Sequence, residues 1–107
     1  MKTNLVFKKI LMSILVVLTA SISIAQKSQI EKANKEFDKY SYIDAREIYL
    51  KIVEDGYESA QVFQKLGDTY YYNSDYPEAE KWYKKLINQY PNEAEPIYYY
   101  RTAQCLK

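Results

Sequence analysis

Histidine is absent from the 107 residues, and glycine occurs only twice, at Gly56 and Gly67. The lack of histidine excludes a serine–histidine catalytic triad and a histidine-ligated zinc site within this segment. Two isolated glycines cannot form a glycine-rich loop that cradles phosphate. The single cysteine, Cys105, has no partner for an intrachain disulfide, and we expect its thiol to be buried in the hydrophobic core beside the last helix. We therefore expect no enzyme activity, metal, cofactor or small-molecule substrate in this segment.

Acidic pairs are the remaining candidates for acid–base chemistry. Asp44 lies close to Glu47 in the sequence, and Glu78 lies close to Glu80. Both pairs fall where helices are expected to begin or to face water, and no apolar pocket is evident that would raise a carboxyl pKa. We interpret both pairs as solvated helix surface.

Residues 1–25 differ in composition from the rest of the chain. A start containing three lysines is followed by an apolar run from Ile10 to Leu18. Small residues at Ser23 and Ala25 suit signal peptidase, so we predict a signal peptide that is cleaved before Gln26. The alternative is a retained membrane anchor, because Leu5–Ala25 is long enough to span a bilayer.

The charge of residues 26–107 is nearly balanced. Twelve basic and fourteen acidic residues remain after the leader, and the two signs are interspersed along the chain. Such a surface does not attract nucleic acid or an anionic membrane by charge. We expect no nucleic-acid partner, and any membrane association must come from domains downstream of this segment.

Apolar spacing predicts an all-α fold, since no stretch alternates with period two for long enough to suggest a strand. Phe63, Leu66 and Tyr70 recur at the three- and four-residue spacing of a helix. A loop is expected at 73–75, where Ser74 or Asp75 can cap the following helix. The buried face of that helix is expected to contain Trp82, Tyr83, Leu86 and Ile87.

A repeat period of about 34 residues relates the helical segments. With Ala60 as position 1, apolar, small and proline residues fall at positions 4, 7, 8, 11, 20, 24, 27 and 32, namely Phe63, Leu66, Gly67, Tyr70, Ala79, Tyr83, Leu86 and Pro91. This layout resembles the tetratricopeptide repeat (TPR), a helix–turn–helix module. The resemblance implies an all-α, TPR-type α-solenoid of antiparallel helix pairs. Gly67 would allow close approach of the second helix, and Ala79 would face it across the contact.

The repeat boundaries follow from the same register. Repeats are expected at about 26–59 and 60–93, with a partial third repeat at 94–107 that contains only a first helix. In the first unit Gly56 can supply a left-handed helix stop, and three polar residues occupy positions that are normally apolar, Gln29, Lys32 and Glu36. In the third, Ala103 and Leu106 are the expected core residues, but Ala103 is two places late. Either an insertion lies at Glu95–Pro96, or the helix starts a turn later with proline in its first turn.

The TPR resemblance also implies a binding groove lined by the first helix of each repeat. Thirteen tyrosines follow the leader, and tyrosine is a good contact residue because it offers a rigid face with a polar tip. The candidate partner-binding residues are Asn34, Phe37, Gln64, Asp68, Tyr71, Tyr72 and Tyr98. Tyr71, Tyr72 and Tyr98 are the candidate anchors for a partner, and the alternative is that these three pack against the following repeat. A clamp for a peptide carboxylate is not expected, because Asp68 would repel it.

The order of leader and repeats is similar to the N-terminal region of a group of OmpA-family Gram-negative envelope proteins. In that group TPRs precede a β-propeller and an OmpA-like peptidoglycan-binding domain. The resemblance implies a periplasmic or outer-membrane scaffold that binds a protein or peptide of the cell envelope, in secretion or gliding machinery. The alternative is a non-catalytic N-terminal accessory domain of an envelope peptidase or glycan hydrolase. In either case, we expect residues 26–107 alone to be helical but to unfold readily.

Overall fold

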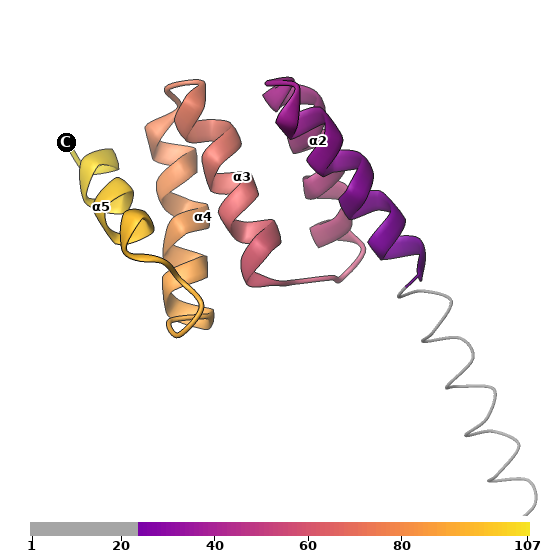
Figure 1. Ribbon diagram of the computed structural model, residues 1–107. Helices are drawn as coiled ribbons and strands as arrows, with labels where there is room; N and C mark the ends of the chain where they lie inside the picture. Colours follow the sequence, from indigo (N-terminus) through magenta and orange to yellow (C-terminus); the bar gives the residue numbers. More distant parts are fainter. Residues whose placement is uncertain (1–23) are drawn as a thin grey trace, which may run out of the picture.

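The computed structural model describes residues 24–107, and its regular structure is entirely helical (Figure 1). A first helix covers residues 24–38 and is followed by α2 (Tyr42–Glu54), α3 (Ala60–Tyr72), α4 (Tyr76–Gln89) and α5 (Pro96–Cys105). Within the described part no strand is present, which confirms the all-α prediction there. The predicted signal peptide lies almost wholly outside the described residues.

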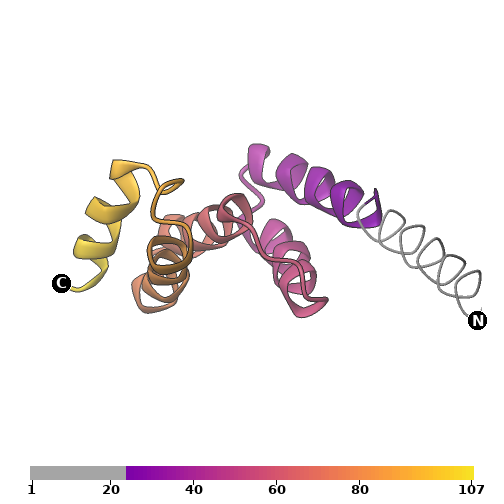
Figure 2. The same ribbon diagram turned by 90° about the horizontal axis from the view of Figure 1, so that it is seen from below.

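The helices follow one another as antiparallel neighbours and form an elongated array (Figures 1 and 2). α3 packs against both α2 and α4, and α4 packs against α5. The bounds of α3 agree with the predicted start of the second repeat at Ala60. α5 begins at Pro96, two residues later than the repeat period predicts, with proline in its first turn. A two-residue delay is compatible with both alternatives for this region.

Three of the helix ends use the same left-handed turn. Tyr40, Gly56 and Ser74 have φ values of 64°, 97° and 62°. In each case the residue after the left-handed position donates its backbone N–H to a carbonyl five residues earlier, as Tyr57 does to Ile52 at 3.1 Å. The predicted stop at Gly56 is therefore confirmed. Tyr40 and Ser74 lie one repeat period apart, so the turn recurs with the sequence pattern.

Helix starts are less uniformly capped. Ser59 precedes α3, and its hydroxyl accepts a hydrogen bond from the Val62 N–H at 3.1 Å. Asp75 occupies the position before α4, but its side chain makes no capping bond there, and Ser74 forms the preceding turn. The expectation that one of these two side chains caps α4 is therefore wrong. Pro77 in the first turn fixes a helical φ without sacrificing an intrahelical bond.

The core runs along the facing sides of the helices. Its fully buried residues include three large side chains, Tyr49, Phe63 and Tyr83, whose relative exposure is 0%. Val62 and Leu66 from α3 join a cluster with residues of α2 and the first helix, whereas Phe63 packs with Leu86 of α4. α3 is therefore buried from both sides.

Close approach of α3 and α4 depends on Gly67. A methyl group added there would lie 2.3 Å and 2.4 Å from the Cε1 and Cδ1 atoms of Tyr83. The ring of Tyr83 therefore occupies the space that any side chain at position 67 would need. Ala79 is fully buried as expected, but the atoms nearest to Gly67 belong to Tyr83. The small residue at 67 thus makes room for an aromatic ring.

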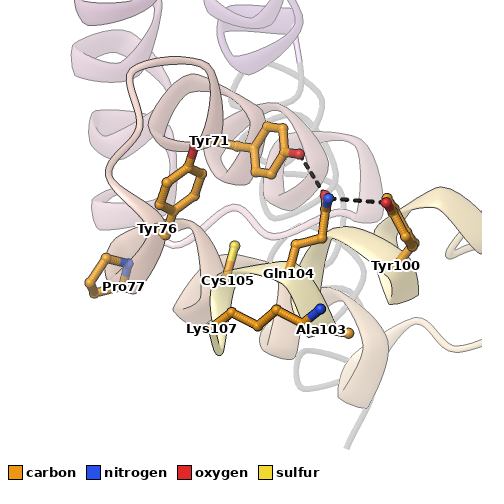
Figure 3. Close-up of a pocket in the computed structure, with 8 residues that line it drawn as sticks. All are labelled: Tyr71, Tyr76, Pro77, Tyr100, Ala103, Gln104, Cys105 and Lys107. Carbon is orange, nitrogen blue, oxygen red and sulfur yellow. Dashed lines mark hydrogen bonds between the residues drawn. The ribbon is translucent and has the colours of Figure 1, made fainter.

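α5 is the least buried helix of the described part, and it contains no buried residue. The expectation that Ala103 and Leu106 are core residues is wrong: Ala103 is exposed, and Leu106 is 65% exposed beyond the end of α5. Cys105 is half-buried and lies beside a surface cavity, so its predicted place in a helix core is also wrong. Ala103 is thus exposed on α5, whereas Cys105 lies near Tyr76 and Pro77 at the start of α4 (Figure 3).

Candidate functional site

The predicted groove residues are distributed over two regions of the surface. Asn34 lines a hollow of about 410 Å³ beside the first helix, together with Lys27, Ile30 and Gln61. In the repeat resemblance, positions 2, 5 and 9 of each repeat face the groove, and these four residues occupy such positions. Gln64 lies on α3 and is half-buried. The structure thus brings part of the predicted groove together around one hollow.

The second region is centred on Asp68, which is only 5% exposed. Tyr83 on α4 donates its hydroxyl hydrogen to Asp68 Oδ1 at 2.6 Å, and Tyr98 on α5 donates to Oδ2 at 3.3 Å. Arg101 on α5 donates from Nη1 to Oδ1 at 2.7 Å, forming an ion pair. One carboxylate therefore links three helices, and we name Asp68, Tyr83, Tyr98 and Arg101 the Asp68 cluster.

Tyrosine rings surround the guanidinium of Arg101. Its Cζ atom lies 4.9 Å, 5.2 Å and 5.8 Å from the ring centroids of Tyr71, Tyr72 and Tyr98, within the range of cation–π attraction. Arg101 Nη2 also donates to the Tyr72 hydroxyl at 3.2 Å, and Tyr71 donates to Gln104 Oε1 at 2.7 Å. The tyrosines predicted as partner anchors therefore contact the next helix of the same chain.

Burial and hydrogen bonding set the ionisation of this cluster. Burial raises the pKa of the Asp68 carboxyl above its ordinary value, although the hydrogen bond from Tyr83 and the charge and hydrogen bond of Arg101 oppose the rise. Burial lowers the pKa of Arg101, but hydrogen bonds and the charge of Asp68 outweigh this and raise it. Burial and the adjacent Asp68 raise the pKa of Tyr83 well above its ordinary value. Arg101 therefore stays charged, and Tyr83 stays protonated.

The predicted first repeat contains a neutral counterpart of the Asp68 cluster. Tyr49 on α2 donates its hydroxyl hydrogen to Asn34 Oδ1. Tyr49 and Asn34 each lie one repeat period before Tyr83 and Asp68, so the same contact recurs with the sequence pattern. The change from Asn34 to Asp68 adds a charge, and that charge is neutralised by Arg101.

A second recurring contact involves a cation and an aromatic ring. Lys65 Nζ lies 4.0 Å from the ring centroid of Phe37, and Arg101 covers Tyr71 in the same manner. Phe37 and Tyr71 lie one repeat period apart, whereas the separation of Lys65 and Arg101 exceeds the repeat period by two residues. This difference equals the delay in the start of α5 relative to α3. Equivalent helix positions therefore make equivalent contacts.

Arg101 and Gln104 were missed by the sequence reasoning, which selected only Tyr98 from α5. The signal that could have identified Arg101 was Asp68, a carboxylate expected on a largely apolar helix face, since such a group needs a charged partner. Its partner could not be placed because the register of α5 was left open between two alternatives. The predicted groove residue Phe37 also belongs to this region, because the ring centroids of Phe37 and Tyr72 are 6.3 Å apart.

The exposed edge of this region is rich in tyrosine. Tyr72 is 45% exposed, Tyr76 is 42% exposed and Tyr40 is 78% exposed. The rings of Tyr42 and Tyr72 are 5.1 Å apart, so the aromatic side chains form a continuous surface at the helix ends. Such rings offer rigid contact area to a partner.

Within residues 24–107, no group of histidine, cysteine and acidic residues could hold a metal ion. No helix of this described part is long and apolar enough to cross a bilayer. Every buried side-chain nitrogen and oxygen in the same region has a hydrogen-bond partner. The geometry of the Asp68 cluster is thus that of a closed, satisfied linkage between helices.

The sequence matches no protein-family model and no curated protein. Evidence that the two predicted repeats are related therefore comes only from the sequence and structure of this chain. The periodic spacing of its residues, turns and hydrogen bonds is the ground for assigning it a role.

Proposed function

We propose that the chain is a TPR-type α-solenoid that acts as an exported protein–protein interaction scaffold. The observation that carries this proposal is one hydrogen bond made twice, from Tyr49 to Asn34 and again one repeat period later from Tyr83 to Asp68. Two unrelated helix pairs would have no reason to place the same donor and an equivalent acceptor at the same helix positions. Repeats of this kind present extended surfaces to partners rather than catalytic pockets.

The partner of this scaffold is a protein or peptide of the cell envelope. Two surfaces support this role: the hollow beside Asn34, and the exposed aromatic edge that includes Tyr72. Tyr72 is held in place by Arg101 and by the neighbouring ring of Tyr42, so it loses little conformational entropy when a partner binds. The segment belongs to an outer-membrane or peptidoglycan-associated protein that serves secretion or gliding machinery. This cellular assignment is supported by the leader pattern and by the family resemblance of the sequence.

Export is tested with a reporter enzyme that is active only outside the cytoplasm, fused after Lys107. We expect activity and a mature N-terminus at Gln26. An inactive fusion would contradict the envelope assignment. The reading frame beyond Lys107 provides a further test. An OmpA-like domain would support the scaffold, and a peptidase or glycan-hydrolase domain would favour the accessory-domain alternative.

Partner binding is tested with a photo-crosslinking residue placed at Tyr72 in the exported chain. Lys51, an exposed residue of α2 away from the aromatic edge, is the matched control position. We expect an adduct with one envelope protein from position 72 and none from position 51. Equal labelling from both positions, or no adduct from either, would contradict the proposed binding surface.

A further inference from the structure

Tyr40 is held in an unfavourable backbone conformation and is nevertheless exposed. Its φ is 64°, in the left-handed region that glycine enters far more easily than a residue with a Cβ. Its side chain is 78% exposed, and among the described residues its ring contacts only the ring of Tyr42, at 6.3 Å between centroids. Gly56 makes the corresponding turn at another helix end without this strain. The stability of the turn therefore does not account for a large aromatic side chain at position 40.

Tyr40 lines a shallow hollow beside the turn that joins the first helix to α2. The hollow has a volume of about 220 Å³, and its lining also contains Tyr42, Ile43, Asp44 and Asn73. Ile43 is 59% exposed, and Asp44 is exposed as well. Two aromatic rings, an aliphatic side chain, a carboxylate and an amide thus border one hollow. We name these five residues the Tyr40 pocket.

Asp44 gives the Tyr40 pocket a negative charge. Among residues 24–107, no cation forms an ion pair with this carboxylate. The nearest basic residues in the sequence make other contacts. Lys39 pairs with Glu36 at 3.9 Å, and Arg46 Nη2 donates to the Thr69 carbonyl at 2.8 Å. The dipoles of the two helices oppose each other here, because the negative end of the first helix meets the positive end of α2. A cation is therefore the electrostatic complement of this hollow.

The chain itself shows which cation suits a carboxylate beside tyrosine rings. Arg101 pairs with Asp68 at 2.7 Å, and its guanidinium lies 5.2 Å from the ring centroid of Tyr72. A planar guanidinium can stack on a ring and donate forked hydrogen bonds to a carboxylate, which a lysine ammonium cannot do. No cation of the described part lies over Tyr40 or Tyr42. The Tyr40 pocket thus has the groups that hold Arg101, without an arginine.

We propose that the Tyr40 pocket binds an arginine side chain of the partner protein. The guanidinium stacks on the exposed ring of Tyr40 and pairs with the Asp44 carboxylate, and the side-chain oxygen of Asn73 accepts a further N–H. The aliphatic part of the arginine rests on Ile43. This inference rests on the proposed function for the existence of a separate partner, and it adds the chemical group that the aromatic edge recognises.

The test titrates the full, isotope-labelled chain with two blocked tripeptides, which carry arginine or lysine between two glycines. Chemical-shift changes of the Tyr40 pocket report binding. We expect the arginine peptide to bind about threefold more tightly than the lysine peptide. Asp44→Asn and Tyr40→Gly should each weaken arginine binding about fivefold, which corresponds to about 1 kcal/mol. Tyr40→Phe keeps the ring and should keep the affinity. Asp55→Asn removes an exposed carboxylate at the other end of α2 and is the matched control for charge.

Tyr40→Gly separates binding from folding, because it removes the ring and also relieves the left-handed strain. We expect the thermal midpoint to rise while the affinity falls. Unchanged affinity in Tyr40→Gly or Asp44→Asn would overturn the proposal, as would an equal loss in Asp55→Asn. Equal affinity for the two peptides would show a general attraction of cations and would also overturn it.

Two other occupants of the Tyr40 pocket are outcomes of the same titration. Shifts that change with chain concentration in the absence of peptide would show that a second copy fills the pocket. Loss of peptide binding when the natural chain beyond Lys107 is included would show that the chain fills it with its own residues. Either result overturns the proposal. A single adduct from position 72 in the crosslinking experiment would then leave the proposed function standing, and the absence of that adduct would contradict the proposed function whatever the peptides show.

Discussion

Replacement of Gly67 with alanine perturbs the contact between α3 and α4 at its tightest point. The added methyl group would lie 2.3 Å from Tyr83 Cε1, far inside van der Waals contact. Tyr83 cannot move aside freely, because it is fully buried and donates a hydrogen bond to Asp68. In an exposed helix the same replacement would stabilise by about 1 kcal/mol, since alanine has the higher helix propensity.

Two costs oppose this gain. Forcing an extra carbon into a packed core costs about 1–3 kcal/mol. If the ring of Tyr83 swings out, its hydrogen bond to a charged acceptor is lost, at about 1.5–3 kcal/mol. We therefore expect Gly67→Ala to lower the free energy of unfolding by about 2 kcal/mol once the propensity gain is subtracted.

Urea unfolding followed by circular dichroism measures this change, with the single variants and the double variant Gly67→Ala/Tyr83→Leu compared in one cycle. Removal of the ring leaves room for the methyl group, so the cost of Gly67→Ala is expected to disappear in the Tyr83→Leu background. Ala33, the equivalent residue one repeat period earlier, provides a matched control: Ala33→Gly should lose about 1 kcal/mol from propensity. A neutral or stabilising Gly67→Ala in the parent chain would refute the close-approach reasoning.

Three further outcomes are expected. Arg101→Met should lower the free energy of unfolding by about 3 kcal/mol, because it leaves the Asp68 carboxylate buried without its cation. In urea unfolding, adding Asp68→Asn to this variant should restore part of the loss. Full stability of Arg101→Met would contradict the pairing. Burial raises the pKa of Tyr49 and Tyr83 above the ordinary value of 10.0, so their stabilisation is complete below pH 10 and is lost as the pH rises, by about 1.4 kcal/mol per pH unit for each phenol. Alkaline titration by circular dichroism should show a shallower loss for Tyr49→Phe, and an unchanged slope would argue against this linkage. Tyr40→Gly should raise the thermal midpoint, with a gain of about 1 kcal/mol, because Tyr40 has a left-handed φ of 64°. A lowered midpoint would show that its aromatic contacts matter more.

Local patterns predicted much of the helical framework. Ala60 was identified as a repeat start and is the first residue of α3, and Gly56 was identified as a left-handed stop. Both signals are local, because capping and glycine conformation depend on neighbouring residues. The left-handed turns at Tyr40 and Ser74 were less predictable. Tyrosine and serine, unlike glycine, are strained in this conformation, so the surrounding structure must hold them in it.

The candidate site was less accessible to sequence reasoning because it depends on the register between helices. Asp68 was placed on the groove side of α3 as a residue that would repel an acidic ligand. In the structure it is buried and paired with Arg101 of α5, and the whole of α4 separates the two residues in the sequence. No local pattern specifies that pair. It follows only once α5 starts at Pro96, and a shift of one residue would move Arg101 about 100° around the helix.

The sequence pattern also did not predict that Ala103 and Leu106, at the last helix of the array, are exposed. Ala103 and Leu106 have the three-residue spacing of core residues, and the same spacing separates the buried Phe63 and Leu66 in α3. The pattern specifies which side of a helix is apolar, but burial requires a second helix on that side. In the described part of the chain, α3 has such a neighbour in α4, and α5 does not.

The central claim is that one helix-pair geometry recurs with the repeat period of the sequence. Nuclear Overhauser spectroscopy tests it most directly through two contacts of the tyrosine rings. We expect cross-peaks from the Tyr83 ring to Gly67 and Asp68 and, in the same spectrum, from the Tyr49 ring to Asn34. A Tyr83 ring without contact to Gly67, or a Tyr49 ring that contacts other parts of the chain instead of Asn34, would contradict the account.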